Sequence, residues 1–268
     1  MSLLSYTGVG SIVLTAAALL KCGVDTLGSR TAGSGPPTRG PDPQSRTGAQ
    51  GHAGGTREEE PMDDEDPIRT PEDFDEVWAR VEATEDGLSE DDGAVPHRAA
   101  CHVLTALPND PALVEVGSRG GRSTVVPASA MRALRPSDML VSTDPQDRQR
   151  PDPGHAANGT PGHEGFRDSL VDTRLLDWVE VVRGRSADAV QGRRIGLLLL
   201  NGLHDRARIR EDFERLGPSV APGGLVVLHD HRPDRWLDVV RFVDELGGDD
   251  RFDPVTVTGT VVVLRRRP

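Results

Sequence analysis

Residues 113–124 read LVEVGSRGGRST, and this stretch constrains the fold more than any other part of the chain. A short apolar run ends at a glycine, the next residues are small, and the sequence after them is typical of a helix start. Downstream, the apolar stretch MLVSTDP ends near Asp144. A strand, a glycine turn, a helix and a second strand with a terminal carboxylate predict the start of a nucleoside-binding α/β domain. Such a carboxylate can accept hydrogen bonds from both ribose hydroxyls.

The glycine turn differs from the turn that binds dinucleotides. It reads Glu115-x-Gly117-x-x-Gly120-Gly121 and lacks the middle glycine of G-x-G-x-x-G. It also places an acid within the strand, which suits a ligand with a positively charged amino group better than a ligand with phosphates. S-adenosylmethionine (SAM) is such a ligand. The alternative is a tight strand-to-helix turn that binds nothing.

The charge of the chain is concentrated in one segment. The 268 residues carry a formal net charge of −12, but residues 58–92 hold 17 acids and only two basic residues, Arg69 and Arg80. The remaining sequence is therefore slightly basic, and only 3% of the residues are aromatic. These values argue against nucleic acid as the main partner. The acidic segment is expected to be a solvated linker and helix face rather than a docking site.

The first 61 residues differ in composition from the rest. Residues 1–20 are uncharged and include an apolar run, as in an export signal or a marginal membrane span, yet no basic residue precedes that run. Residues 28–61 are rich in Gly, Pro, Ser, Thr and Arg and are expected to be disordered. We interpret residues 1–61 as a translated leader before a start at Met62; the alternative is a genuine tail. A cytoplasmic protein without membrane contact is expected unless residues 1–20 are a working signal or anchor.

Residues 62–108 combine the acidic segment with two predicted helices. The first is expected to start at Thr70, with Pro71 in its first turn, and to carry Phe74, Val77, Trp78 and Val81 on one face. The second is expected to cover Arg98–Leu107. Both precede the next domain and are predicted to cover one edge of it.

Residues 109–268 alternate between strands and helices. Near-continuous Val, Leu and Ile, typical of a parallel sheet buried on both faces, predict strands at 113–117, 139–144, 179–184, 195–201 and 223–229. Helices are predicted at 122–134, 163–177, 206–216 and 234–246. The ending PVTVTGTVVVLRRR predicts two strands around Thr258-Gly259. The expected fold class is α/β, with seven mostly parallel strands, a terminal antiparallel hairpin and helices on both faces.

Two of the predicted strands end in polar residues. Asn201 and His204 follow one strand, and His229, Asp230 and His231 follow the next. Because neighbouring strand ends line the ligand crevice of an open parallel sheet, these side chains are expected to converge beside the glycine turn. Imidazoles, a carboxylate and an amide can bind a metal or supply a general base. The alternative is that the histidines only cap loops.

Residues 71–267 resemble the class I SAM-dependent methyltransferases, especially a bacterial family with the motifs E-I-G-x-x-x-G-x-S-T, D-P, D-G-x-H and P-G-G followed by H-D. The matching residues are Glu115-Val-Gly117-Ser-Arg-Gly120-Gly121-Arg-Ser123-Thr124, Asp144-Pro145, Asn201-Gly202-Leu-His204, and Pro222-Gly223-Gly224 leading to His229-Asp230. The resemblance implies a Rossmann-like sheet and SAM as the cofactor. It also implies cofactor contacts at the turn residues Glu115, Gly117, Ser118, Gly120, Gly121, Ser123 and Thr124, at Asp144 for the ribose, at Ser186 and Ala187 near the adenine, and at Asn201.

Two departures from the family pattern bear on activity. Asn201 stands where the family has Asp, and a neutral amide oxygen is a weaker ligand for Mg²⁺. A metal site built from Asn201, His229 and Asp230 is therefore doubtful. Pro127 lies in the predicted helix 122–134, where it removes a backbone hydrogen bond and is expected to kink the helix. Both departures leave open a protein that binds SAM but catalyses slowly or not at all.

The function predicted from the sequence is methyl transfer from SAM to a small-molecule acceptor, with O-methylation favoured. A hydroxyl acceptor must lose a proton, and an ordinary histidine titrates near pH ~6.5. His229 is the first candidate base and His204 the second, with Asp230 orienting His229 or binding a metal. The alternatives are a non-catalytic SAM-binding protein and an NAD(P)-dependent Rossmann oxidoreductase. Residues 144–163 are predicted to form a lid or acceptor-selecting loop; the alternative is a flexible surface insertion.

Overall fold

The computed structural model describes residues 71–82, 88–107, 111–143, 163–182, 184, 186, 192–201 and 205–268. The predictions for residues 1–61, for most of the loop 144–163, and for Asp144, Ala187 and His204 lie outside the described residues. Within these ranges, no helix has both the length and the apolar content that crossing a membrane requires.

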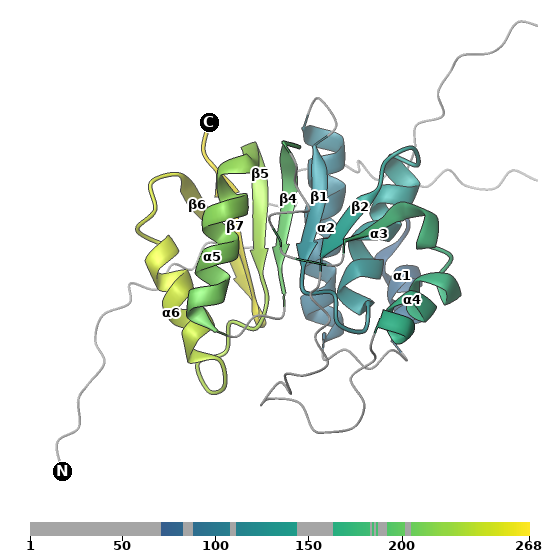
Figure 1. The fold of residues 1–268 in the computed structure, drawn as a ribbon, viewed down its shortest axis with the longest axis horizontal. Helices are drawn as coiled ribbons and strands as arrows, with labels where there is room; N and C mark the ends of the chain where they lie inside the picture. The colour runs from purple at the N-terminus through teal and green to yellow at the C-terminus, as the bar shows by residue number, and fades with distance from the viewer. Residues whose placement is uncertain are drawn as a thin grey trace, which may run out of the picture. The chain divides into compact units, whose positions relative to one another are not determined.

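Seven strands of the described chain form one sheet in the order β3-β2-β1-β4-β5-β7-β6 (Figure 1). Strands β1 to β5 run parallel, and β7 lies antiparallel between β5 and β6. The predicted fold class, including its terminal hairpin, is confirmed. The bounds are β1 Ala112–Val116, β2 Leu140–Thr143, β3 Val179–Val182, β4 Ile195–Leu200, β5 Val220–Leu228, β6 Phe252–Thr258 and β7 Val261–Arg266.

Helices cover both faces of this sheet (Figure 1). One face carries α1 (Phe74–Val81), α2 (Glu90–Ala106), α3 (Arg122–Leu134) and α4 (His163–Asp172), and the other carries α5 (Arg206–Leu216) and α6 (Leu237–Leu246). Side chains alternate along each strand, so β1 contributes Leu113 to the first core and Val114 to the second. Glu115 therefore lies on the same side as Leu113, towards α2 and α3.

The first helix begins later than the sequence predicts. α1 starts at Phe74, and its cap is Asp73, whose carboxylate accepts a hydrogen bond of 2.9 Å from the N–H of Asp75. Pro71 thus precedes the helix instead of occupying its first turn. The apolar face was predicted correctly, because Val77, Trp78 and Val81 are all buried.

The second helix begins earlier than predicted, at Glu90 instead of Arg98. Ser89 caps it by accepting a hydrogen bond from the N–H of Asp92, and three acids in its first turn suit the positive end of the helix dipole. The prediction was wrong because Pro96 normally interrupts a helix. Here the residues around Pro96 are buried in the core, and this packing holds the helix together. Together with α1, α2 covers a face of the sheet, whereas the sequence predicts that these two helices cover an edge.

The remaining elements differ from the predictions only at their ends. α3 and α5 have the predicted bounds, and α3 runs through Pro127. α4 ends at Asp172 and is followed by a short 3-10 helix, η2 (Leu176–Trp178); another, η4 (Gly217–Ser219), precedes β5. Residues 222–224 lie within β5, where the pairing with β4 is irregular, since Ile195 pairs with Val220 while Leu197 pairs with Leu225.

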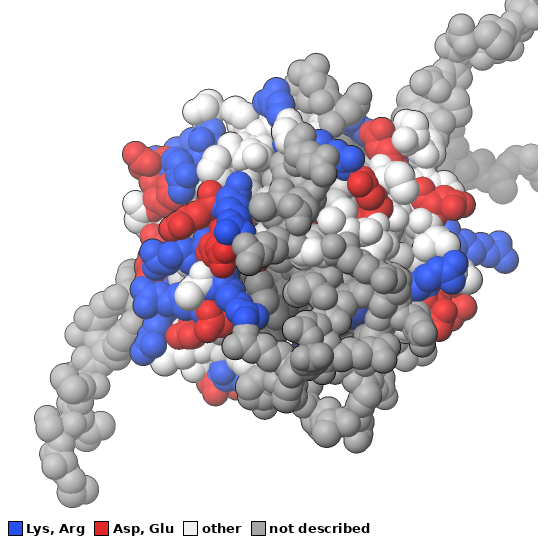
Figure 2. All heavy atoms as spheres, viewed as in Figure 1, with Lys and Arg blue, Asp and Glu red and all other residues white. Residues whose placement is uncertain are grey.

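Charged side chains are mixed over α5 and α6, where blue and red spheres alternate (Figure 2). Arg206 and Arg210 both pair with Glu245, so these arginines connect α5 to α6. Arg251 pairs with Asp249 at 2.6 Å nearby. Because these arginines have acidic partners, this surface does not present a field of one sign.

Candidate active site

The ends of three parallel strands bring polar residues together. Gly117, Asn201 and His229 directly follow β1, β4 and β5. Each extends the ladder by one backbone hydrogen bond: Gly117 N–H to Thr143 O at 2.8 Å, Asn201 N–H to Val116 O at 2.9 Å, and His229 N–H to Leu200 O at 3.2 Å. The three residues are therefore held at the carboxyl edge of the sheet, where open α/β folds bind their ligands.

The turn after β1 depends on glycine at two positions. Gly117 and Gly121 have φ angles of 93° and 98°, in the left-handed region that side chains rarely adopt. A Cβ on Gly121 would also lie 3.1 Å from the ring of Phe166 in α4. Gly121 thus allows α4 to pack against the turn, and its contact with a cofactor stays a prediction. The Ser118 hydroxyl is buried here with no hydrogen-bond partner among the described residues.

Glu115 is fully buried, and its carboxylate accepts hydrogen bonds from three hydroxyls. The donors are Ser123 at 2.7 Å and Thr124 at the start of α3, and Ser142 at 3.0 Å in β2. An ionised carboxylate only accepts hydrogen bonds, so the three hydroxyls match it. They tie β1, β2 and α3 together beneath the glycine turn. The predicted contacts of Glu115, Ser123 and Thr124 with SAM would come in addition to this structural role.

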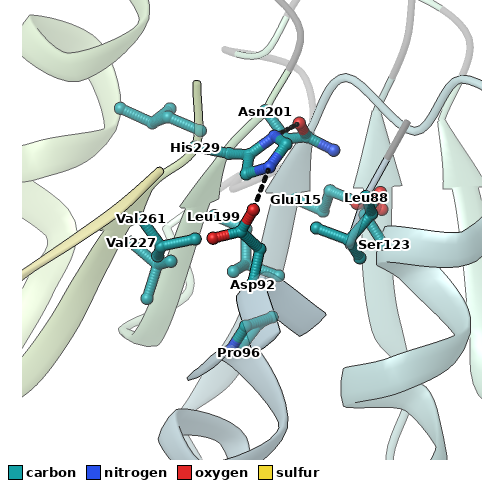
Figure 3. Close-up of a pocket in the computed structure, with 11 residues that line it drawn as sticks. Leu88, Asp92, Pro96, Glu115, Ser123, Leu199, Asn201, Val227, His229 and Val261 are labelled. Atoms are coloured by element: carbon teal, nitrogen blue, oxygen red, sulfur yellow. Dashed lines mark hydrogen bonds and ion pairs between the residues drawn. The ribbon is translucent and has the colours of Figure 1, made fainter. Parts of the chain in front are cut away.

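The imidazole of His229 lies between Asn201, at the end of β4, and Asp92 of α2 (Figure 3). Its Nδ1 is 3.1 Å from Oδ1 of Asn201 and 3.4 Å from Oδ2 of Asp230. Both oxygens are acceptors, so Nδ1 carries the hydrogen. Nε2 faces Oδ2 of Asp92 at 3.9 Å and has no hydrogen-bond partner among the described residues. In the neutral ring, Nε2 is therefore the atom that can accept a proton.

The neighbouring carboxylates change the acidity of this imidazole. Burial lowers the pKa of His229, but the close contact with Asp230 and the negative charges of Asp230 and Asp92 outweigh that effect and raise the pKa from 6.5 to about 9. Burial also works against ionisation of Asp92, yet the nearby His229 and the hydrogen bonds from Thr260 and Ser89 lower its pKa from 3.8 to about 2. At neutral pH the pair is an imidazolium beside a carboxylate. The expected titration of His229 as an ordinary histidine is corrected accordingly.

Asp92 is a site residue that the sequence analysis missed. It lies in the first turn of α2, it is only 6% exposed, and the sequence analysis counts it with the solvated acidic segment. Its Oδ1 accepts from the Thr260 N–H at 2.8 Å, and its Oδ2 accepts from the hydroxyls of Ser89 at 2.8 Å and Thr260 at 3.0 Å. The only sequence signal was Ser89-x-x-Asp92, which marks a helix start and does not reveal the contact with His229.

A small pocket with a cavity volume of about 20 Å³, partly open to solvent, lies beside these residues (Figure 3). It is enclosed by α2, by the ends of the central strands and by the start of β7. Its polar lining comes from Asp92, Glu115, Ser123, Asn201 and His229, and its apolar lining from Leu88, Pro96, Leu199, Leu200, Val227 and Val261.

Two predicted site residues make other contacts. Ser186 is buried and donates a hydrogen bond to Asp212 of α5, so its hydroxyl serves the packing of that helix. The N–H of His231 donates to Thr260 O at 2.9 Å, and its side chain does not line the pocket. Asn201, His229 and Asp230 do come together, as the sequence predicts.

In the described ranges, no group of three or more His, Cys, Asp and Glu side chains is arranged to hold a metal ion. In the turn after β1, Ser118 has a buried hydroxyl that lacks a partner among the residues described, so this hydroxyl is available to a polar group of SAM.

Residues 114–231 match a family model described as a methyltransferase domain. This range begins in β1, includes the glycine turn and ends just beyond His229. Within this range the chain is therefore similar to a methyltransferase domain, the part of an enzyme that transfers one-carbon groups. No curated protein matches the sequence.

Several solved O-methyltransferases share this fold. NovP is 18% identical, with a TM-score of 0.55 over 68% of this chain and 84% of that chain. TomG from Streptomyces achromogenes, in complex with SAM, is 17% identical, with a TM-score of 0.51 over 75% of this chain and 92% of that chain. An O-methyltransferase from Bacillus cereus, in complex with SAH, is 14% identical, with a TM-score of 0.50 over 72% and 90%. At these identities the likeness establishes the fold.

Proposed function

We propose that the protein transfers the methyl group of SAM to a hydroxyl of a small-molecule acceptor, with His229 as the general base. The observation that carries the proposal is the buried Nε2 of His229, a proton-accepting atom with no partner among the described residues. It borders a pocket whose lining includes Glu115 and Ser123, one on each side of the glycine turn. A base and a cofactor turn at one edge of the sheet are the two parts that this reaction needs.

The residues present can perform the steps that fall to the protein. Bound SAM supplies an electrophilic methyl group on a sulfonium, whose leaving group is neutral and needs no acid. The protein must align the acceptor and remove its proton. Asn201 engages the Nδ1 hydrogen of His229, so Nε2 is left for the acceptor. Because the pKa of His229 is about 9, most of the base is protonated at neutral pH. We expect the rate to rise about tenfold per pH unit towards pH 9.

The pocket walls favour an acceptor that is apolar around its hydroxyl. Leu88, Pro96 and Val261 line one space with His229, and apolar walls bind apolar surface by removing it from water. NovP and TomG are both described as O-methyltransferases, which supports a hydroxyl acceptor for this chain as well.

A SAM-binding protein without activity is the second candidate. It is favoured by the protonated state of His229 at neutral pH and by the amide of Asn201 in place of the family's carboxylate. A nicotinamide-dependent oxidoreductase is less well supported, since β7 runs antiparallel between β5 and β6, unlike the strands of a six-stranded dinucleotide-binding sheet.

Calorimetric titration with SAM and with NAD, each with and without Mg²⁺, tests the cofactor. We expect SAM to bind and NAD not to bind. We expect Asp144→Ala to weaken SAM binding about tenfold or more, because two charge-assisted hydrogen bonds to the ribose are lost. The control Asp172→Ala, which removes an exposed acid at the end of α4, should bind as the wild type does.

Methyl transfer from labelled SAM to a panel of phenolic and alcoholic acceptors, at pH 7 and pH 9, tests the reaction. Labelled product that increases at pH 9 supports the proposal. SAM binding without transfer at either pH would favour the second candidate, and no SAM binding would overturn both.

A further inference from the structure

We infer that Asp92 of α2 is a positioning residue for this reaction: it orients the imidazole of His229 and stabilises the positive charge that the ring gains with the acceptor's proton. The inference rests on the proposed function. It adds to the site a residue from the N-terminal helices, outside the strand–helix domain that carries the sequence motifs.

The turn between β6 and β7 holds the carboxylate of Asp92 in one position. Gly259 makes room for it, since a Cβ at Gly259 would lie 2.3 Å from Oδ1 of Asp92. The backbone N–H and the hydroxyl of Thr260 each donate to one of its oxygens, and Ser89 donates from the same helix turn. Asp92 and Thr260 are 168 residues apart in the chain. Three donors and a glycine are therefore arranged around one carboxylate.

This carboxylate lies on the proton-accepting side of His229. Asn201 and Asp230 occupy the Nδ1 side, and Nε2 faces Oδ2 of Asp92 at 3.9 Å. That separation is too long for a direct hydrogen bond. It does allow a hydroxyl oxygen to lie about 2.8 Å from both atoms. Because Nε2 is buried, an acceptor hydroxyl contacts Nε2 and Asp92 together only when it enters the space between them.

Three carboxylates of the described residues face this region, and each has a different role. Glu115 of β1 lines the same pocket and accepts hydrogen bonds from Ser123, Thr124 and Ser142. Asp230 lies on the Nδ1 side of the ring. Asp92 alone of the three faces Nε2. The pKa of Asp92 is about 2, so it remains ionised and does not compete with His229 for the proton.

Methyl transfer with His229 as the base accounts for every bond and every proton. The acceptor's O–H bond breaks and its proton moves to Nε2 of His229. The oxygen's electron pair forms the bond to the methyl carbon, and the electrons of the sulfur–carbon bond return to sulfur. The products are the methylated acceptor, S-adenosylhomocysteine and an imidazolium beside Asp92, which later releases its proton to solvent. Asp92 stabilises that imidazolium, as the carboxylate of a His–Asp pair does in other enzymes.

The first test uses Asp92→Asn, which removes the charge and keeps the size. Its control is Asp91→Asn, an exposed neighbour in the same helix turn. The full chain is labelled with ¹⁵N-histidine, and the His229 resonances are identified by comparison with His229→Asn. We expect the pKa of His229 to fall by about one unit or more in Asp92→Asn and to stay unchanged in Asp91→Asn.

The same variants are assayed for methyl transfer across pH. In Asp92→Asn the rising limb of the pH–rate profile should move to lower pH together with the pKa of His229. The plateau kcat should fall about tenfold or more, because the imidazolium loses its counter-charge. The affinity for SAM should change by less than about twofold, since Asp92 is not among the predicted cofactor contacts.

A second pair of variants leaves the side chains of Asp92 and His229 in place. Gly259→Ala places a Cβ against Oδ1 of Asp92, while Gly192→Ala introduces a residue with a similar positive φ where nothing lies within 4 Å. Both variants carry comparable backbone strain, but only Gly259→Ala displaces the carboxylate. We expect Gly259→Ala to lower the pKa of His229 and Gly192→Ala to leave it unchanged.

The outcomes are distinguishable. An unchanged pKa of His229 in both Asp92→Asn and Gly259→Ala would overturn the inference, even if both variants lost thermal stability. A pKa that falls in a protein whose wild type transfers no methyl group would support the Asp92–His229 pairing and refute the proposed function.

Discussion

At the scale of single residues, the properties of His229 come from its neighbours. Its position after a strand is visible in the sequence, but two carboxylates and an amide surround it only in the folded chain. The strand end places the ring in the pocket, Asn201 determines which nitrogen carries the hydrogen, and the carboxylates determine the charge. A histidine recognised by its position alone would be assigned the wrong protonation state at neutral pH.

Replacing His229 by Ala should separate catalysis from cofactor binding. We expect kcat to fall about 100-fold or more, because a positioned base contributes that much to proton removal. The Kd for SAM should stay within about twofold of the wild-type value. The control is His231→Ala, which removes the neighbouring histidine that does not line the pocket. Equal losses of turnover and SAM affinity in His229→Ala would refute its role as the base.

At the scale of elements, α2 determines whether the site is complete, and α3 holds the segments around it. Arg122 in the first turn of α3 donates to the carbonyls of Val81 at 3.1 Å, Glu82 at 2.8 Å and Leu88 at 2.6 Å. Its guanidinium also lies 5.2 Å from the centre of the Trp78 ring. One side chain thus connects the end of α1 and the start of α2 to the helix that follows the glycine turn.

Arg122→Met should destabilise the protein by about 2 kcal/mol, because three charge-assisted hydrogen bonds to carbonyls are lost while the apolar stem is kept. Urea unfolding followed by tryptophan fluorescence measures the change. The control Arg98→Met replaces an exposed arginine of α2 and should change the stability by less than about 0.5 kcal/mol. Similar losses in the two variants would show that Arg122 has no special role in joining these helices.

At the scale of the whole molecule, the Asp92–His229 pair couples stability to pH. The folded-state pKa of His229 is about 9 against an ordinary 6.5, so its stabilising contribution is complete below pH 6.5 and is lost as the pH rises through 9. The folded-state pKa of Asp92 is about 2 against 3.8, so its contribution is present above pH 3.8 and is lost as the pH falls through 2. The contact between Asp92 and His229 contributes to both pKa shifts, so the two contributions to stability are not added together.

We therefore expect the free energy of unfolding to fall between pH 6.5 and pH 9 by an amount on the order of 3 kcal/mol that is specific to His229 and its two carboxylates, Asp230 and Asp92. Urea unfolding of the wild type and of His229→Gln at several pH values measures it. In His229→Gln, the free energy of unfolding should not show this fall between pH 6.5 and pH 9. Parallel curves for the two proteins would contradict the pairing.

Much of the sheet could be predicted from the sequence because its determinants are local. Apolar runs of strand length, glycines at a tight turn and helical spacing between them depend on neighbouring residues, so the strand sequence, the hairpin and the bounds of α3 and α5 were recovered. Strand ends of a parallel sheet meet at one edge, which is why Asn201, His229 and Asp230 were grouped correctly.

The start of α2 and the place of Asp92 could not be obtained in this way. Pro96 is an unfavourable helix residue that local propensity rejects, and only burial against the sheet compensates for it. The sequence alone determined the fold class, the position of the glycine turn after β1, and the polar residues at the ends of β4 and β5. Tertiary structure alone decided that an acid from the N-terminal segment faces His229 and sets its charge, because the contact joins residues 137 positions apart and depends on a glycine turn that admits one carboxylate.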